Sequence, residues 1–206
     1  MGKSMIGLAV VAALVLGGTS AKAADQLIAG KLLLIKNPPD PTKNRLVFLS
    51  KDPSIAIPGS VAEDPRCNPD GSGNSIFSVF DFETGQSVSF NLPCANWSRR
   101  IATTYKYKDP TGATCKIIKV KNGVLMKAVC QGSQIAYDLG ATQNAVRVSL
   151  QSGSLNYCTV FSAARGCEVK KDGSDDKTYL AKNCTGAPAV CGGSPSGAFL
   201  DGAANF

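Results

Sequence analysis

The chain of 206 residues contains no histidine, and this absence excludes several kinds of chemistry. Ser-His-Asp triads, Cys-His pairs and histidine-ligated metal sites all need an imidazole, so none of them is expected. Charged residues make up only 18% of the sequence and aromatic residues 7%, with a single Trp. Apolar residues nevertheless reach 44%, which is enough for a packed core and is not typical of a disordered chain.

Long apolar runs are also missing, apart from a short one near the N-terminus. Residues 5–16 are apolar, whereas a membrane-spanning helix needs about 20 such residues. Lys3 precedes this run, and Ala21-Lys22-Ala23 supplies small residues at a cleavage point. We therefore interpret residues 1–23 as a signal peptide, residues 24–191 as one domain and residues 192–206 as a flexible Gly-rich tail. No transmembrane segment is expected after cleavage, so the protein is predicted to be secreted, periplasmic or at the cell surface.

The eight cysteines all lie in the mature part, and no two of them form a Cys-x-x-Cys pair. Metal-binding cysteines usually occur in such close pairs, whereas an even number in an exported chain is typical of a disulfide framework. We therefore predict four disulfides, no metal and no cofactor.

One disulfide follows from hairpin geometry. Asn122-Gly123 favours a two-residue type I′ turn, in which the numbers of paired residues add to 245. Cys115 and Cys130 add to this number, so they should face each other and form a disulfide. Strand-like runs around a polar loop at residues 172–176 suggest a second pair, and elimination leaves two more. These three pairs are Cys167–Cys184, Cys67–Cys94 and Cys158–Cys191.

Alternation of apolar and polar residues recurs along the mature chain with the period of a half-buried strand. It is clearest in residues 87–92, where Val88, Phe90 and Leu92 alternate with Ser and Asn. The pattern predicts an all-β fold of about ten strands, either a disulfide-stapled antiparallel β-sandwich or a jelly-roll-like fold. Strands are expected at residues 27–36, 45–50, 75–82, 86–92, 115–121, 124–130, 134–139, 145–150, 157–161, 167–171 and 178–182.

Two parts of the chain resemble each other. Residues 31–36 and 45–49 form one expected hairpin, and residues 116–121 and 124–128 form another. Further expected strands follow each hairpin, at residues 87–92 and 133–139 respectively. A duplicated four-strand unit would produce a two-sheet fold, although amphipathic strands also resemble one another by convergence.

The most distinctive local feature is a basic segment from Arg99 to Lys127, which holds eight Lys or Arg residues against the single acid Asp109. Aromatic residues interleave with the lysines and could form a platform for sugars, although burial in the core is the more common environment for any one of them. Such a surface suits anionic polysaccharide, lipid headgroups or nucleic acid, and export favours an anionic glycan or cell-surface polymer over nucleic acid. The alternative is a solvated face whose lysines protect an edge strand from aggregation. The candidate ligand-binding residues are Trp97, Tyr105, Lys106, Tyr107, Lys108, Lys119 and Lys121.

Catalytic candidates are limited to carboxylates, because a glycosidase-type pair needs no histidine. No spacing singles out two of them, so we predict no catalytic residue. A non-enzymatic binding or structural module of undefined oligomeric state is favoured. The alternatives are a secreted polysaccharide hydrolase with a carboxylate pair, and a subunit of an extracellular fibre. The available acids are Glu63, Asp64, Asp81, Glu83, Asp138 and Glu168.

The order of several motifs resembles an uncharacterised domain of secreted bacterial proteins. These motifs are residues 92–97 (Leu-Pro-Cys-Ala-Asn-Trp), residues 105–109 (Tyr-Lys-Tyr-Lys-Asp), the Cys115–Cys130 hairpin and residues 156–161 (Asn-Tyr-Cys-Thr-Val-Phe). The resemblance covers most of residues 28–191 and implies a bacterial, exported β-domain. That domain has no assigned activity, so no functional residue carries over. Four cysteines are additions to its usual pattern: Cys67, Cys94, Cys167 and Cys184.

Overall fold

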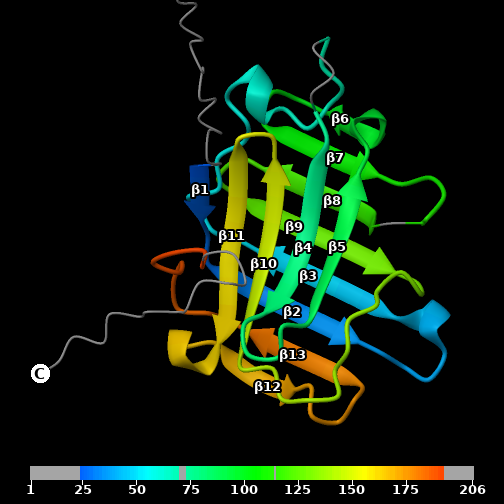
Figure 1. Ribbon diagram of the computed structural model, residues 1–206. Coiled ribbons are helices and arrows are strands. Elements are labelled where there is room, and N and C mark those ends of the chain that lie inside the picture. The colour runs from blue at the N-terminus through cyan, green and yellow to red at the C-terminus, as the bar shows by residue number, and fades with distance from the viewer. Residues whose placement is uncertain (1–23, 70–72, 114, 193–206) are drawn as a thin grey trace, which may run out of the picture.

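The computed structural model describes residues 24–69, 73–113 and 115–192, and these residues form thirteen strands in two facing sheets (Figure 1). This confirms the predicted all-β, disulfide-stapled sandwich. The predicted signal peptide, and the predicted tail beyond residue 192, lie outside the described residues. Four short 3-10 turns interrupt the loops: η1 (Pro41–Lys43), η2 (Val61–Glu63), η3 (Cys94–Asn96) and η4 (Ala163–Arg165).

The five-stranded sheet has the order β1-β11-β10-β4-β5. Its pairs are antiparallel except for β1, which runs parallel to β11 at the edge. Its strands are β1 (Ala24–Leu27), β11 (Leu155–Ser162), β10 (Ala145–Ser152), β4 (Ser75–Asp81) and β5 (Ser87–Leu92).

The eight-stranded sheet is antiparallel throughout and has the order β12-β13-β2-β3-β9-β8-β7-β6. It therefore contains six strands that are paired on both sides. Its strands are β12 (Glu168–Asp172), β13 (Thr178–Lys182), β2 (Gly30–Lys36), β3 (Arg45–Ser50), β9 (Leu125–Gln131), β8 (Cys115–Lys121), β7 (Thr104–Lys108) and β6 (Trp97–Arg99).

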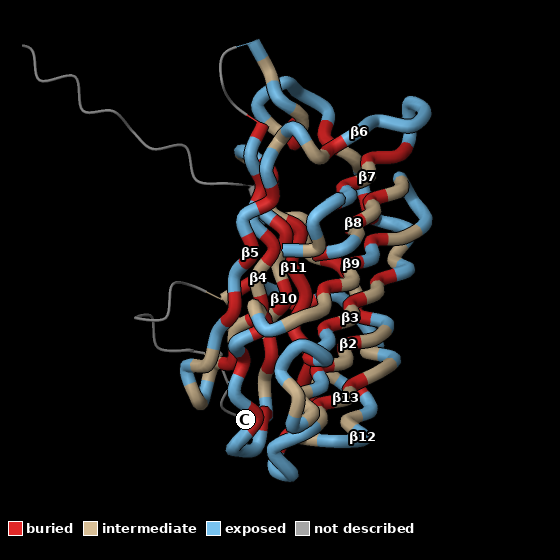
Figure 2. Tube along the Cα trace, turned by 90° about the vertical axis from the view of Figure 1, so that its right-hand side faces the viewer, coloured by how far each residue is buried: buried red, intermediate tan, exposed pale blue. Residues whose placement is uncertain are grey.

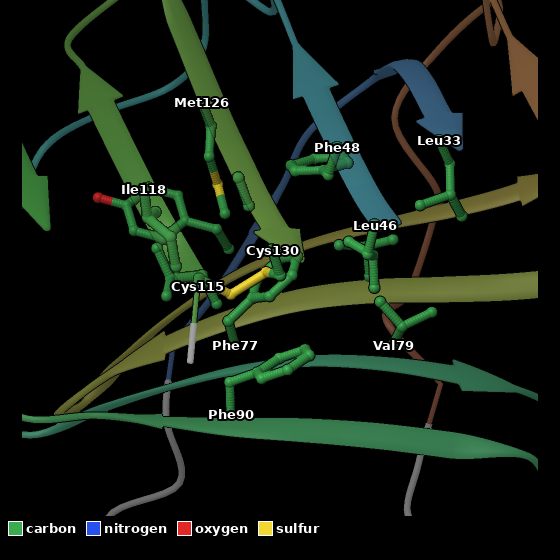
Figure 3. Packing of buried hydrophobic residues seen from close by; sticks show 14 of the residues in the cluster. Leu33, Leu46, Phe48, Phe77, Val79, Phe90, Cys115, Ile118, Met126 and Cys130 are labelled. Atoms are coloured by element: carbon green, nitrogen blue, oxygen red, sulfur yellow. A yellow bond between two sulfur atoms is a disulfide. The ribbon is translucent and has the colours of Figure 1, made fainter. Parts of the chain in front are cut away.

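The core lies between the sheets, where alternate residues of each strand point inward. Phe48 of the eight-stranded sheet is fully buried, with its ring 6.3 Å from that of Phe77 and 6.1 Å from that of Phe161 (Figure 3). Leu46 and Met126 point into the same layer. Because alternate side chains point in opposite directions, this inward set also determines which residues form the two outer faces.

Two four-strand units have the same arrangement. Strands β2 and β3 lie in the larger sheet and lead to β4 and β5 in the smaller one; β8 and β9 lead to β10 and β11 in the same way. The units meet where β3 pairs with β9 and β4 pairs with β10. Duplication predicts this arrangement. The last pair of the second unit is β10 and β11, however, and does not include the strand that was expected at residues 133–139.

Two expected strands are wrong. The single strand expected at residues 27–36 is divided, because β1 belongs to one sheet and β2 to the other, with buried Ile28 between them. Residues 134–139 are not a strand. Their alternation arises because Ile135, Tyr137 and Leu139 are buried in a connecting segment.

The hairpin between β8 and β9 also differs from the expectation. Lys121 pairs with Leu125, so the loop contains three residues and not two. Gly123 has a φ of 62°, but Asn122 has no positive φ. A type I′ turn requires positive φ at both central positions, so the predicted turn type is wrong.

The disulfide that was predicted from this hairpin is nevertheless present, because a bulge between Cys115 and Ile117 shifts the register by one residue and brings Cys115 opposite Cys130 (Figure 3). The other three predicted pairs are also confirmed, and no cysteine is free. They are Cys67–Cys94, Cys158–Cys191 and Cys167–Cys184.

Candidate functional site

Three lysines form a row across the outer face of the eight-stranded sheet. Lys106 of β7 is paired directly with Lys119 of β8, which in turn is paired with Lys127 of β9. Side chains at directly opposed positions of antiparallel strands have Cβ atoms about 4.5–5.5 Å apart. We call these three residues the lysine row.

A shallow hollow of about 390 Å³ lies beside the lysine row. Strands β7 and β8 supply most of its lining, and the loop between β6 and β7 supplies the rest. Four of its seven lining residues are cationic and none is acidic, so it is suited to an anionic group. We call it the basic hollow, and it is lined by Arg100, Ile101, Thr104, Lys106, Ile117, Lys119 and Lys121.

The cations of β7, β8 and β9 on this face have no acidic partner in the part of the chain that the structure describes. The four ion pairs found there lie on other elements. These three strands contain no Asp or Glu, and the acids of the sheet, Glu168 and Asp172, lie on its far edge strand β12. Like charges directly opposite each other on a sheet are destabilising, so the lysine row is not explained by stability.

Three of the predicted ligand-binding residues are buried in the core, which contradicts the expected aromatic platform. Trp97, Tyr105 and Tyr107 are at most 6% exposed and belong to the buried core cluster. The Trp97 and Tyr107 rings lie 5.4 Å apart. The reason is the alternation Tyr-Lys-Tyr-Lys in β7, which places tyrosines on the inner face and lysines on the outer face.

The buried Tyr105 anchors the loop that follows η2. Its hydroxyl donates a hydrogen bond of 3.0 Å to Asp64, which also accepts hydrogen bonds from the Arg66 guanidinium. Burial raises the pKa of the Asp64 carboxyl, but these hydrogen bonds outweigh it and hold the pKa below its ordinary value. This carboxylate is therefore a structural acceptor.

The other predicted carboxylates also accept hydrogen bonds, and Glu83 accepts one from the Asn144 side chain. Glu63 accepts from two backbone N–H groups ahead of η2, and Asp81 accepts from the N–H groups of Glu83 and Thr84. Glu168 accepts from Asn183 and Asp138 accepts from Gly140. These bonds shape loops and strand ends. Within the described residues, no group of three or more Asp, Glu or Cys is arranged to hold a metal ion.

Three other hollows are larger but carry less positive charge. One of about 460 Å³ is lined by uncharged residues, and one of about 780 Å³ has a single cation, Arg165, together with the acid Glu83. The third, of about 560 Å³, contains Arg147, but its guanidinium lies over the rings of Phe80 and Phe82 and donates to the Gly192 carbonyl. We therefore place the candidate site at the basic hollow.

The structure brings together the four lysines that the sequence analysis selected, since Lys106, Lys108, Lys119 and Lys121 all project from the outer face of β7 and β8. It adds Lys127 to the row and Arg100 to the hollow. Their alignment depends on the strand register. The one-residue error in the predicted hairpin turn misplaced Lys127 relative to Lys119.

Comparison of the chain with protein-family models, with curated proteins and with solved structures finds no match. In the described residues, no helix has the length and apolar character needed to cross a membrane.

Proposed function

We propose that the protein is an exported, non-enzymatic binding module that holds an anionic polysaccharide or cell-surface polymer at the basic hollow. The observation that carries this proposal is the lysine row, in which three like charges are aligned without an acidic partner among the described residues. Repeating anionic groups of a polymer complement such a row, and their binding relieves the repulsion within it.

Edge protection explains the row less well. Lysines protect a sheet against aggregation when they lie on an edge strand. Lys119 and Lys127 lie on β8 and β9, which are each paired on both sides, and the edge strand β6 already ends with Arg99. The lysines are therefore in the interior of the sheet, where this function is not needed.

Export is supported by the cysteine chemistry. All eight cysteines are paired in four disulfides, and such bonds persist in oxidising compartments. A secreted or periplasmic domain of the kind suggested by the motif resemblance is consistent with this pairing. Contact with a surface polymer would take place in the same compartment.

The test is salt-dependent retention on immobilised heparin and on polygalacturonate, which present sulfate and carboxylate groups respectively. In the test variant Lys106, Lys108, Lys119 and Lys121 are each replaced by Ser. We expect it to elute at markedly lower salt than the wild type, because it loses four cations from one face.

A control variant removes the same formal charge elsewhere, through Ser at the exposed positions Lys43, Lys51, Lys170 and Lys177. Exposed ion pairs contribute about 0–1 kcal/mol, so this variant should fold normally. We expect its elution to stay close to that of the wild type. Equal shifts in the two variants would show that only net charge matters, and the basic hollow would then have no specific function.

The two alternative functions remain predictions. A hydrolase requires two carboxylates roughly 5–10 Å apart across a cleft, and the described acids instead accept hydrogen bonds that hold loops and strands in place. A fibre subunit could donate its N-terminal strand to a neighbour, but β1 pairs with β11 of its own chain over four residues.

A further inference from the structure

The outer face that carries the lysine row also carries a continuous aliphatic surface. Leu180, Leu34, Val47 and Val129 are paired in sequence across β13, β2, β3 and β9, and Ile117 of β8 extends the series. Leu32 and Leu49 are paired in the adjacent row. We call these seven residues the aliphatic patch.

The aliphatic patch is partly exposed, and no described element covers it. All seven side chains are intermediate in exposure, whereas their inward neighbours are fully buried. Figure 2 shows the eight-stranded sheet from its side, with no described segment beyond its outer face. A sheet face that meets only water is normally polar, so this composition needs a separate explanation.

The patch and the lysine row form one surface. At about 4.8 Å between strands, the aliphatic patch extends roughly 19 Å from β13 to β8. The two rows are two residues apart along each strand, which is about 7 Å. Lys127 pairs with Leu49, so the cationic and aliphatic halves meet directly.

The charge of this surface is of one sign on the six inner strands, since the acid Glu168, opposite Lys182, lies on the edge strand β12. The six inner strands of the sheet contain lysines on every strand except β3, which begins with Arg45. None of the six contains Asp or Glu. Its complement therefore has to supply anionic groups and apolar groups side by side.

We propose that the outer face of the eight-stranded sheet docks on the surface of an anionic lipid membrane. Phosphate headgroups would occupy the basic hollow and the lysine row, while the aliphatic patch would contact the boundary between headgroups and acyl chains. The long methylene stems of the lysines allow their charges to stay with the headgroups. This inference goes beyond the proposed function, because the same cations would face lipid phosphates in addition to the anionic groups of a polymer.

A hydrophilic polysaccharide alone would leave the aliphatic patch exposed to water. A second copy of the chain would cover it, but would also bring two lysine rows together without intervening acids. A lipid surface satisfies both halves at once. Electrostatic attraction to acidic lipids contributes about 1 kcal/mol for each Lys or Arg near the surface, so the five lysines of β7, β8 and β9 on this face are enough for measurable binding.

The experiment measures co-sedimentation of the oxidised protein with vesicles, one set of phosphatidylglycerol mixed with phosphatidylcholine and one of phosphatidylcholine alone. The patch variant carries Leu34→Thr, Val47→Thr and Val129→Thr. Threonine retains strand propensity, so the variant should fold. Its control carries threonine at three exposed aliphatic residues away from this face: Val61, Ile76 and Val190.

We expect the wild type and the control to bind the anionic vesicles and to leave the neutral ones. The patch variant should bind anionic vesicles about tenfold more weakly and still be retained on heparin as the wild type is. The four-lysine variant should lose both interactions. Thermal unfolding followed by circular dichroism verifies that each variant is folded.

Three outcomes overturn the lipid proposal while leaving the polymer proposal intact. In the first, the patch variant binds anionic vesicles as the wild type does. In the second, the wild type is retained on heparin but ignores anionic vesicles. In the third, a concentration-dependent dimer disappears in the patch variant, which would identify a second copy as the occupant. Unchanged heparin retention in the four-lysine variant overturns the polymer proposal instead.

Discussion

The outer face of the five-stranded sheet carries a row of three serines, and the eight-stranded sheet carries a row of three lysines. Ser149, Ser78 and Ser89 are paired across β10, β4 and β5, and the hydroxyls of Ser78 and Ser149 are 2.7 Å apart. Two hydroxyls of the serine row therefore bond to each other. The lysine row contains only donors and only positive charge, so it cannot satisfy itself.

The difference between the faces is not required by the fold. Both sheets present alternate residues outward, and both bury the opposite set in a shared core. The single cation near the serine row, Arg147, is enclosed by Phe80 and Phe82, and burial lowers the pKa of its guanidinium. The cations of the lysine face remain available. We take this asymmetry as the sign of a binding surface.

The largest expected effect is a loss of stability in the core that both sheets share, which would affect both outer faces. Phe48→Ala removes a fully buried ring that contacts Phe77 and Phe161 from the opposite sheet. We expect the free energy of unfolding to fall by about 3–5 kcal/mol in a denaturant titration. Phe80→Ala, on the outer serine face, should cost clearly less. Similar losses for the two would contradict the assigned inner and outer faces.

An intermediate effect is expected at alkaline pH, and it should involve both sheets. Burial raises the pKa of Tyr137, Tyr157 and Tyr179 above the ordinary value of 10.0. The unfolded chain therefore loses these protons at lower pH than the folded protein. The contribution of these tyrosines to the free energy of unfolding is fully present below pH ~10. It is lost as the pH rises, by about 1.4 kcal/mol per tyrosine for each pH unit.

Thermal unfolding between pH ~8 and ~11 measures this loss. Tyr157→Phe, which removes the hydroxyl bonded to the Ala56 carbonyl, should reduce the slope by about one third. A slope that does not change in this variant would show that its hydroxyl is not protected from ionisation.

The smallest expected effect distinguishes the lysine row from the serine row. Replacing Lys106, Lys119 and Lys127 by Ser should stabilise the protein by about 0.2–1 kcal/mol for each of the two opposed pairs, because repulsion is removed. The reciprocal change of the serine row to three lysines should destabilise it by a similar amount. Both shifts should shrink at high salt. Stabilisation by the native lysines would indicate an unrecognised structural role for them.

Much of the architecture was predictable because it depends on local pattern. Alternation in residues 87–92 predicts β5, and the Glu-Thr-Gly turn at residues 83–85 predicts its boundary with β4. The disulfide between Cys115 and Cys130 was predicted although the turn was assigned wrongly, because a bulge compensates for the longer loop. Alternation failed at residues 134–139, where packing buries alternate residues without a ladder.

The candidate site was predicted only in part. The basic segment was visible in the sequence, and its lysines project outward as a group. Its aromatic residues were assigned to the same surface, although a strand necessarily divides Tyr105 and Lys106 between opposite faces. The aliphatic patch was not predicted, because its members come from strands that are distant in the sequence.

The amino-acid sequence by itself determined the all-β class, most of the strands, the residues that share a side of each strand, and the disulfide between Cys115 and Cys130. These properties depend on neighbours within a few residues or on a short list of combinations. Only the tertiary structure decided which strands adjoin and in what register. Since Lys106, Lys119 and Lys127, like Leu34 and Val47, become neighbours through inter-strand hydrogen bonds, the charge and apolarity of the outer face exist only after the sheet is assembled.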